Sequence, residues 1–413
     1  MRGLTLSVAA AAVVDLACAL PALNSRASAP SSSYASSSSS YTSSASPSAS
    51  ASSSASPPLA STNFSSSLPL PYTPSGGFGT NGSQPVYAPL TDFDSQSLNL
   101  ALYQELIELD LFHYGVAKFS REEFQEVGMN DDDVYLLQYM ADQEAGHATA
   151  IANMLGPNNA SKSCEYSYPV QSVKEYLQFS ESVTRFGEAG AYGFLEHLNS
   201  RDAAQIMLQA ITVEARQEMI LRQFEGIFPM PFWFNPAITQ SMQWTLLAPY
   251  IVGCPDNNTR VQFQNFPALN ITNNPNVSAL TVNATPAASS NETSFTTPGQ
   301  TIYLEWENPG KQVGPNNSYT TNTTAGEPKF VAWISQLNTT YTPLTNISGN
   351  SGHTIQPNVT IYQHSEYTNG SFAPLINGTV FVLVVDEDIP VTPANLTFLN
   401  EHVVAGPAAY FSG

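Results

Sequence analysis

Four segments of this chain combine a helical spacing of apolar residues with a glutamate inside the apolar stripe. The segments span residues 95–119, 131–155, 170–199 and 201–226, and the glutamates are Glu105, Glu144, Glu188 and Glu214. Because helical positions three or four apart share one face, each glutamate is predicted to face the interior of a four-helix bundle. An ionised carboxylate there is costly unless it is paired, hydrogen-bonded or bound to metal. The pattern therefore predicts a bundle with a shared polar site.

Two of these glutamates begin a doublet with a second side chain three residues later, Glu144-Ala-Gly-His147 and Glu214-Ala-Arg-Gln217. One Glu from each of two helices plus Glu-x-x-His from each of the other two is the ligand set of carboxylate di-metal bundles. Two divalent cations would compensate the four carboxylates, and His147 adds a neutral nitrogen. Gln217 stands where the second histidine would be, and its amide oxygen is a weaker ligand. The predicted ligands are Glu105, Glu144, His147, Glu188, Glu214 and Gln217.

A metal-free polar network is the alternative explanation for these buried carboxylates. Such a network would be completed by Arg216 or by protonation of one carboxylate. Glu181, a heptad before Glu188, could replace it as a ligand if the helix register differs. Glu108 is expected at the surface or behind the ligands, and Glu218 in solvent.

The pattern changes beyond the four helical segments. Residues 236–252 predict a shorter helix packed on the bundle, so that the helical domain covers residues 91–255. Residues 256–413 hold β-branched and aromatic runs separated by Asn, Gly and Pro turns, at 301–306, 330–334, 359–362 and 380–385. This spacing favours an antiparallel, sandwich-like β domain. The predicted fold class is mostly α, with a β-rich domain following the bundle.

The first ninety residues indicate secretion. Residues 1–19 have the charged start, short apolar run and small-residue exit of a signal peptide. Residues 20–90 are rich in Ser and Pro and have too little apolar surface to fold, which predicts a disordered stalk. No other stretch is long and apolar enough to anchor the chain in a membrane. The formal net charge of −20, with no basic stripe, argues against nucleic acid as a partner.

Cysteines and glycosylation sequons agree with an extracellular or cell-wall location. Removal of residues 1–19 leaves Cys164 and Cys254, an even number in an oxidising compartment, and we expect them to pair. Between residues 91 and 254 the only sequon is at Asn159, in a predicted loop, whereas sequons are frequent outside that range. The predicted glycosylation sites include Asn159, Asn257, Asn270, Asn338 and Asn377.

Several stretches together resemble a known family. They are 99–108 (NLALYQELIE), 143–147 (QEAGH), 188–192 (EAGAY), 213–218 (VEARQE) and 233–255, which ends in Cys254-Pro255. These stretches are similar to the secreted fungal ferritin-like-domain proteins linked to stress response and sexual development. The resemblance is good over residues 91–255 and looser beyond, and it implies a ferritin-like bundle in an extracellular or cell-wall setting. The broader family has Glu-Ala-Arg-His in the fourth helix, so that Gln217 departs from its pattern.

Two hypotheses of different classes follow from the sequence. In the first, the chain is a secreted, glycosylated ferritin-like protein that binds iron or manganese at a degenerate di-metal site. In the second, it is a cell-wall structural or interaction glycoprotein, in contact with polysaccharide or protein, whose bundle keeps the carboxylates without metal. The sequence assigns no catalytic residue and leaves open whether the protein is an enzyme.

Overall fold

The computed structural model describes residues 84–358 and 378–413. The predicted signal peptide (1–19), nearly all of the predicted stalk (20–90), the predicted strand 359–362 and the sequon at Asn377 lie outside the described residues. The described residues belong to one compact unit, in which helices are followed by antiparallel sheets. The predicted fold class is therefore confirmed.

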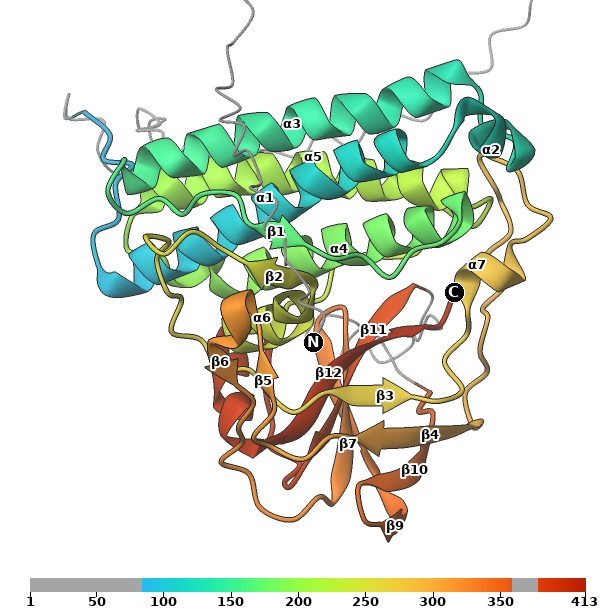
Figure 1. Cartoon of the computed structure of the whole chain (residues 1–413). Helices are drawn as coiled ribbons and strands as arrows, with labels where there is room; N and C mark the ends of the chain where they lie inside the picture. Colours follow the sequence, from blue (N-terminus) through green and yellow to red (C-terminus); the bar gives the residue numbers. More distant parts are fainter. Residues whose placement is uncertain (1–83, 359–377) are drawn as a thin grey trace, which may run out of the picture. The chain divides into compact units, whose positions relative to one another are not determined.

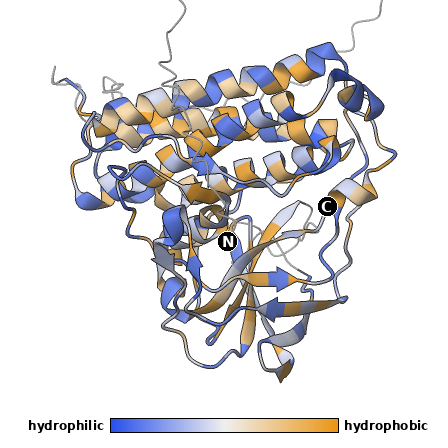
Figure 2. Ribbon diagram, in the orientation of Figure 1, coloured by the Kyte–Doolittle hydropathy of each residue, from blue (hydrophilic) through white to orange (hydrophobic). Residues whose placement is uncertain are grey.

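Four long helices form the bundle and run side by side in Figure 1: α1 (Asp92–Lys118), α3 (Asp131–Leu155), α4 (Val173–Phe194) and α5 (Arg201–Phe224). Each begins at a residue whose side chain accepts a hydrogen bond from the first turn, namely Thr91, Asn130, Ser172 and Ser200. Hydrophobic and hydrophilic residues alternate in bands along these helices (Figure 2). Such banding gives each helix an apolar face to bury.

Shorter helices connect and cover the bundle. They are α2 (Arg121–Glu126), η1 (Leu195–His197), α6 (Gln240–Leu247), η2 (Ala248–Tyr250), α7 (Val277–Leu280), η3 (Pro315–Asn317) and η4 (Pro393–His402). Helix α6 packs against both α1 and α4, as the sequence predicts for the segment after the bundle. Helix α2, with its capping box between Ser120 and Glu123, was not anticipated.

The strands form two main sheets of four strands each, with antiparallel pairing throughout. One sheet has the order β3-β4-β10-β9 and the other β12-β11-β7-β8, and two small ribbons pair β1 with β2 and β5 with β6. The strands are β1 (Glu165–Tyr166), β2 (Ile251–Gly253), β3 (Leu269–Ile271), β4 (Thr301–Trp306), β5 (Gln312–Val313), β6 (Tyr319–Thr320), β7 (Phe330–Ser335), β8 (Asn338–Pro343), β9 (Thr345–Ser348), β10 (Ser351–Ile355), β11 (Thr379–Val385) and β12 (Val403–Phe411).

Strand β11 is buried on both faces and connects the two hydrophobic cores. Its residues Phe381 and Leu383 belong to the same buried cluster as side chains of the long helices. Its alternate residues Val382 and Val384 belong to a second cluster, which includes Ile302 of the other sheet. Because side chains of a strand alternate between faces, the sheet containing β11 lies between the helices and the second sheet. The helical core therefore continues across the predicted boundary at residue 255.

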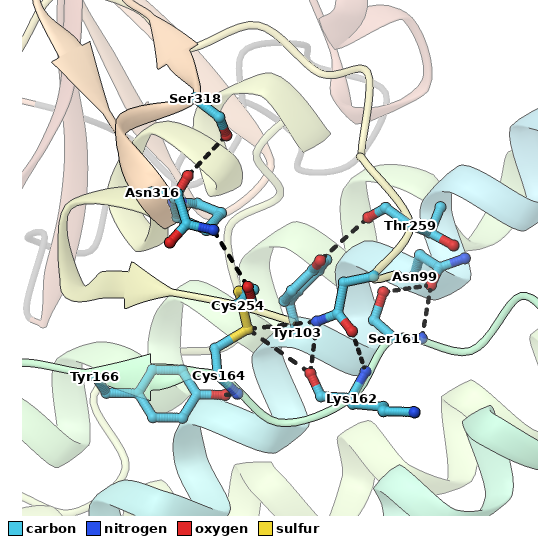
Figure 3. The surroundings of a disulfide bond; sticks show 12 residues. Asn99, Tyr103, Ser161, Lys162, Cys164, Tyr166, Cys254, Thr259, Asn316 and Ser318 are labelled. Atoms are coloured by element: carbon cyan, nitrogen blue, oxygen red, sulfur yellow. Dashed lines mark hydrogen bonds between the residues drawn. A yellow bond between two sulfur atoms is a disulfide. The ribbon is translucent and has the colours of Figure 1, made fainter. Parts of the chain in front are cut away.

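A disulfide joins Cys164, in the crossover between α3 and α4, to Cys254, just after β2 (Figure 3). The adjacent strands β1 and β2 pair with each other. Asn258 adds two hydrogen bonds to Lys162, one through its side-chain oxygen and one through its side-chain nitrogen. The expected pairing of the two cysteines is thus present, and it fixes the crossover to the end of the helical region.

The sequons differ in accessibility. Asn159, Asn257 and Asn270 are exposed, as a glycan acceptor must be. Asn338 is only 5% exposed, and its amide nitrogen donates to the hydroxyl of Thr340, so its burial argues against glycosylation there. Among the described helices, none is long and apolar enough to cross a membrane.

Candidate metal centre

Three helices bring four of the predicted ligands together. Glu105 from α1, Glu144 and His147 from α3, and Glu214 from α5 each offer one ligand atom, and these atoms all lie within 4.8 Å of one another. The three carboxylates are at most 1% exposed. The spacing of Glu144 and His147, three apart on one helix, lets both side chains reach the same point. This convergence of carboxylates and imidazole in the bundle interior can hold a metal ion.

Nδ1 of His147 is the atom that faces the carboxylates. It lies 3.0 Å from Glu144 Oε2, 3.2 Å from Glu105 Oε2 and 3.9 Å from Glu214 Oε1. Burial alone would lower the pKa of His147, but the hydrogen bond and the charge of Glu144 outweigh it, so that the pKa is raised. Without metal, a proton on Nδ1 is therefore stabilised between the carboxylates. A metal ion would take the place of this proton.

Two carboxylates in this region keep oxygen atoms without a hydrogen-bond partner among the described residues. They are both oxygens of Glu214 and Oε2 of Glu108. A buried acceptor with no donor costs about 1–3 kcal/mol or more. The orphaned oxygens and the imidazole nitrogen beside them suit iron or manganese, which take carboxylate and imidazole ligands. The residues present therefore fit a metal ion.

The electrostatics of the site also favour a cation. Burial, followed by the charge of Glu144, raises the pKa of Glu105 well above its ordinary 4.5. Burial, followed by the charge of Glu105, does the same to the pKa of Glu214. Glu108, which was expected at the surface or behind the ligands, is fully buried, and burial followed by the charge of Glu144 raises its pKa. A divalent cation would relieve this mutual repulsion.

Gln217 lies at the site but offers its nitrogen. Its Nε2 donates a hydrogen bond to Glu144 Oε1 and lies 3.2 Å from Gln143 Oε1. The side chain is 2% exposed. In this arrangement the nitrogen of Gln217 holds Glu144 from the neighbouring helix, and the oxygen of the same amide has no hydrogen-bond partner among the described residues.

Glu188 is buried as expected but lies outside the cluster of Glu105, Glu144, His147 and Glu214. Its Oε2 accepts from Nη1 of Arg185 at 2.6 Å, and its Oε1 accepts from Nδ2 of Asn235 at 3.1 Å. Arg185, three residues earlier on α4, is itself 3% exposed and also pairs with Glu218 of α5. The charge of Glu188 is therefore compensated within its own helix, because the guanidinium of Arg185 lies one turn away.

Two other acidic residues of α4 and α5, Glu181 and Glu218, are also paired inside the protein. Glu218 is 1% exposed, so its expected solvation is wrong. Glu181 pairs with the buried Arg222 at 3.3 Å and does not replace Glu188 in the cluster. Arg216, named for a metal-free network, is exposed, whereas Arg185 is buried and pairs with Glu188 and Glu218. The spacing Arg185-x-x-Glu188 within an apolar stripe is the signal that could have identified this pair from sequence.

Comparison with known proteins agrees with this architecture. Residues 93–226, which span the four long helices, match the Ferritin-like domain family. Protein rds1 of Schizosaccharomyces pombe is 49% identical over 367 residues, which cover 86% of this chain and 90% of that protein. The identity therefore extends well beyond the bundle into the sheets. The chain belongs to the same family as Protein rds1, and its helical region is a ferritin-like domain.

Proposed function

We propose that this chain is a secreted, glycosylated ferritin-like protein that binds iron or manganese between α1, α3 and α5. The observation that carries the proposal is the convergence of Glu105, Glu144, His147 and Glu214 within 4.8 Å, in a setting where both oxygens of Glu214 lack a donor among the described residues. Three buried carboxylates at such distances repel one another unless protons or a cation intervene. A divalent ion satisfies all of them at once.

The choice of metal follows from the donor set. Three carboxylates and one imidazole are hard to borderline ligands, without the thiolates that select softer ions. Iron or manganese bound there would supply one-electron redox chemistry. The protein would hold the ion away from bulk water, since the carboxylates are at most 1% exposed and His147 is 13% exposed.

The extracellular or cell-wall setting is part of the proposal. It is supported by the signal-like start of the sequence, by the sequons outside the helical region, and by the pairing of Cys164 with Cys254. Disulfides persist in oxidising compartments and are rare in the cytosol. A role in stress response or development is proposed from the resemblance of the helical region to secreted fungal relatives.

One observation favours a second candidate, a metal-free structural or interaction protein of the cell wall that contacts polysaccharide or protein. His147 and Gln217 already donate toward Glu144, so protein donors stabilise part of the cluster. Protonation of Glu105 or Glu214, whose pKa values are raised first by burial, would complete such a network. In this candidate the bundle is a scaffold and its surface carries the function.

Metal content distinguishes the two candidates. The full chain, purified without chelators and titrated anaerobically with Fe(II) or Mn(II), should retain at least about one equivalent of metal after desalting. His147→Ala removes the only nitrogen ligand of the cluster and should lower affinity at least tenfold. His113→Ala, a change at an exposed histidine on α1, is the matched control and should bind like the unmodified protein.

Two results would end the proposal. The first is less than about a tenth of an equivalent of transition metal, with no uptake from Fe(II) or Mn(II), which leaves the metal-free candidate. The second is equal affinity in the His147→Ala and His113→Ala variants, which would place any bound metal elsewhere.

A further inference from the structure

Arg185 is a buried cation that contacts two carboxylates and one amide oxygen. From α4 its Nη1 donates to Glu188 Oε2 at 2.6 Å and to Asn235 Oδ1 at 2.7 Å, and its Nη2 pairs with Glu218 of α5. The centre of the guanidinium lies 4.5 Å from the centroid of the Phe232 ring, as in a cation–π contact. Its position is therefore fixed from two helices and from the loop between α5 and α6.

The two carboxylates around Arg185 would otherwise form a cation site. Glu188 is fully buried and Glu218 is 1% exposed, and they project from neighbouring helices. Without a compensating charge, a buried carboxylate costs several kcal/mol. Here the guanidinium supplies that charge, and Asn235 satisfies the second oxygen of Glu188. Both oxygens of Glu188 are therefore held by Arg185 and Asn235, outside the neighbouring cluster.

Helix α5 also offers fewer ligands than a site for two metal ions requires. Two ions in a carboxylate bundle draw on a glutamate from each helix and on two Glu-x-x-His doublets. Here Glu214 joins the cluster, but Gln217 turns its nitrogen toward Glu144. The second ion would lack both its carboxylate from α4 and its nitrogen from α5. Only one complete ligand set remains.

We infer that the bundle is built for a single metal ion, with the guanidinium of Arg185 acting as a permanent cation in place of a second one. The inference rests on the proposed function, since it presupposes that the cluster around His147 binds metal. Arg185 is a positioning residue in this account, because it holds Glu188 and Glu218 and touches no metal ligand of the cluster.

The surroundings of Arg185 make the replacement testable. A cavity of about 300 Å³ reaches Arg185, Glu188 and Glu218, and its wall includes the exposed side chains of Met230 and Trp233. Small ions can therefore reach these carboxylates if the guanidinium is removed. The site would then contain two carboxylates and an amide oxygen, which are ligands that Mn(II) accepts.

Stoichiometry is the direct readout. Anaerobic titration of the full chain with Mn(II), followed by desalting and elemental analysis, should give about one equivalent for the unmodified protein. Arg185→Leu frees two buried carboxylates and should raise the capacity to about two equivalents. Arg185→Lys keeps a cation and should stay at one. Arg121→Leu, the loss of an exposed arginine that pairs with the exposed Asp131, frees no buried carboxylate; it is the control and should also stay at one.

The measured stoichiometry tests the single-ion inference separately from the proposed metal-binding function. Uptake of about two equivalents by the unmodified protein overturns the inference and leaves the proposed function intact. Uptake of none removes the proposed function, and the inference falls with it. A folded Arg185→Leu variant that still binds one equivalent also contradicts the inference.

Glu188→Gln keeps the question answerable if Arg185→Leu does not fold. This change preserves shape and removes one carboxylate that the inference excludes from the metal site. Mn(II) affinity and stoichiometry should stay within about threefold of the unmodified protein. A loss of tenfold or more would identify Glu188 as a ligand and overturn the inference.

Discussion

Gln217 donates a hydrogen bond from its side-chain nitrogen to the carboxylate of Glu144, across from α5 to α3. The oxygen of the same amide has no partner among the described residues. Since an amide nitrogen cannot coordinate a metal, this nitrogen of Gln217 serves to orient Glu144. Where the Glu-x-x-His pattern has a ligand nitrogen, this chain thus has an amide nitrogen that donates a hydrogen bond to the ligand Glu144.

Gln217→His tests this reading of the site. An imidazole at this position has a nitrogen that can coordinate, on the same helical face as Glu214, and should raise Fe(II) or Zn(II) affinity by about tenfold. Isothermal titration under anaerobic conditions measures the change. Gln217→Ala is the control, because it removes the hydrogen bond to Glu144 without adding a ligand and should lower affinity. Equal affinities in all three proteins would mean that position 217 does not face the metal.

The stability of the protein should depend on pH in opposite directions with and without metal. Burial, followed by the charge of Glu105, raises the pKa of Glu214 well above 4.5, so the folded metal-free protein keeps a proton that the unfolded chain releases. The resulting stabilisation is full below about pH 4.5 and is lost as pH rises through the folded-state pKa. Bound metal requires the ionised carboxylate, so the gain in melting temperature from metal should increase with pH.

Glu214→Gln isolates this effect. The variant lacks the titrating group, so the melting temperature of its metal-free form should fall less as pH rises than that of the unmodified protein. Thermal unfolding followed by circular dichroism from about pH 5 to 8 gives both curves. Superimposable pH dependences for the two metal-free proteins would contradict the raised pKa of Glu214.

The disulfide between Cys164 and Cys254 should contribute substantially to stability. The bond spans a sequence separation of 90 residues. On the chain-entropy description, a crosslink of this span stabilises the folded state by about 4 to 5 kcal/mol, and measured effects are often smaller. The double substitution Cys164→Ala and Cys254→Ala should lower the free energy of unfolding by about 2 to 4 kcal/mol in urea denaturation. A change below about 0.5 kcal/mol would mean that the crossover is held mainly by Asn258 and the β1–β2 pair.

The sequence predicted those features that depend on local spacing. The four long helices follow from apolar periodicity and from caps such as Thr91, and the convergence of Glu144 with His147 follows from a separation of three residues. Strand β11 was predicted from its continuous apolar run. The run is continuous because the strand is buried on both faces, one in each hydrophobic core.

Features that depend on packing between elements could not be predicted in the same way. The second partner of Glu188 is Asn235, which lies in a distant loop, and the apolar stripe of α4 gives no sign of that contact. Likewise, Glu218 is buried because α4 presents Arg185 to it. The pairing order of the sheets depends on contacts between strands far apart in the sequence, which turn signals do not specify.

Anomalous diffraction from crystals of the full chain grown with Mn(II) would locate the bound ion. We expect one strong peak, roughly 2 Å from His147 Nδ1 and from carboxylate oxygens of Glu105, Glu144 and Glu214. We also expect Arg185 to contact Glu188 still, with no second peak between Glu188 and Glu218. A map with saturating Mn(II) and no peak among the four cluster residues would contradict the account.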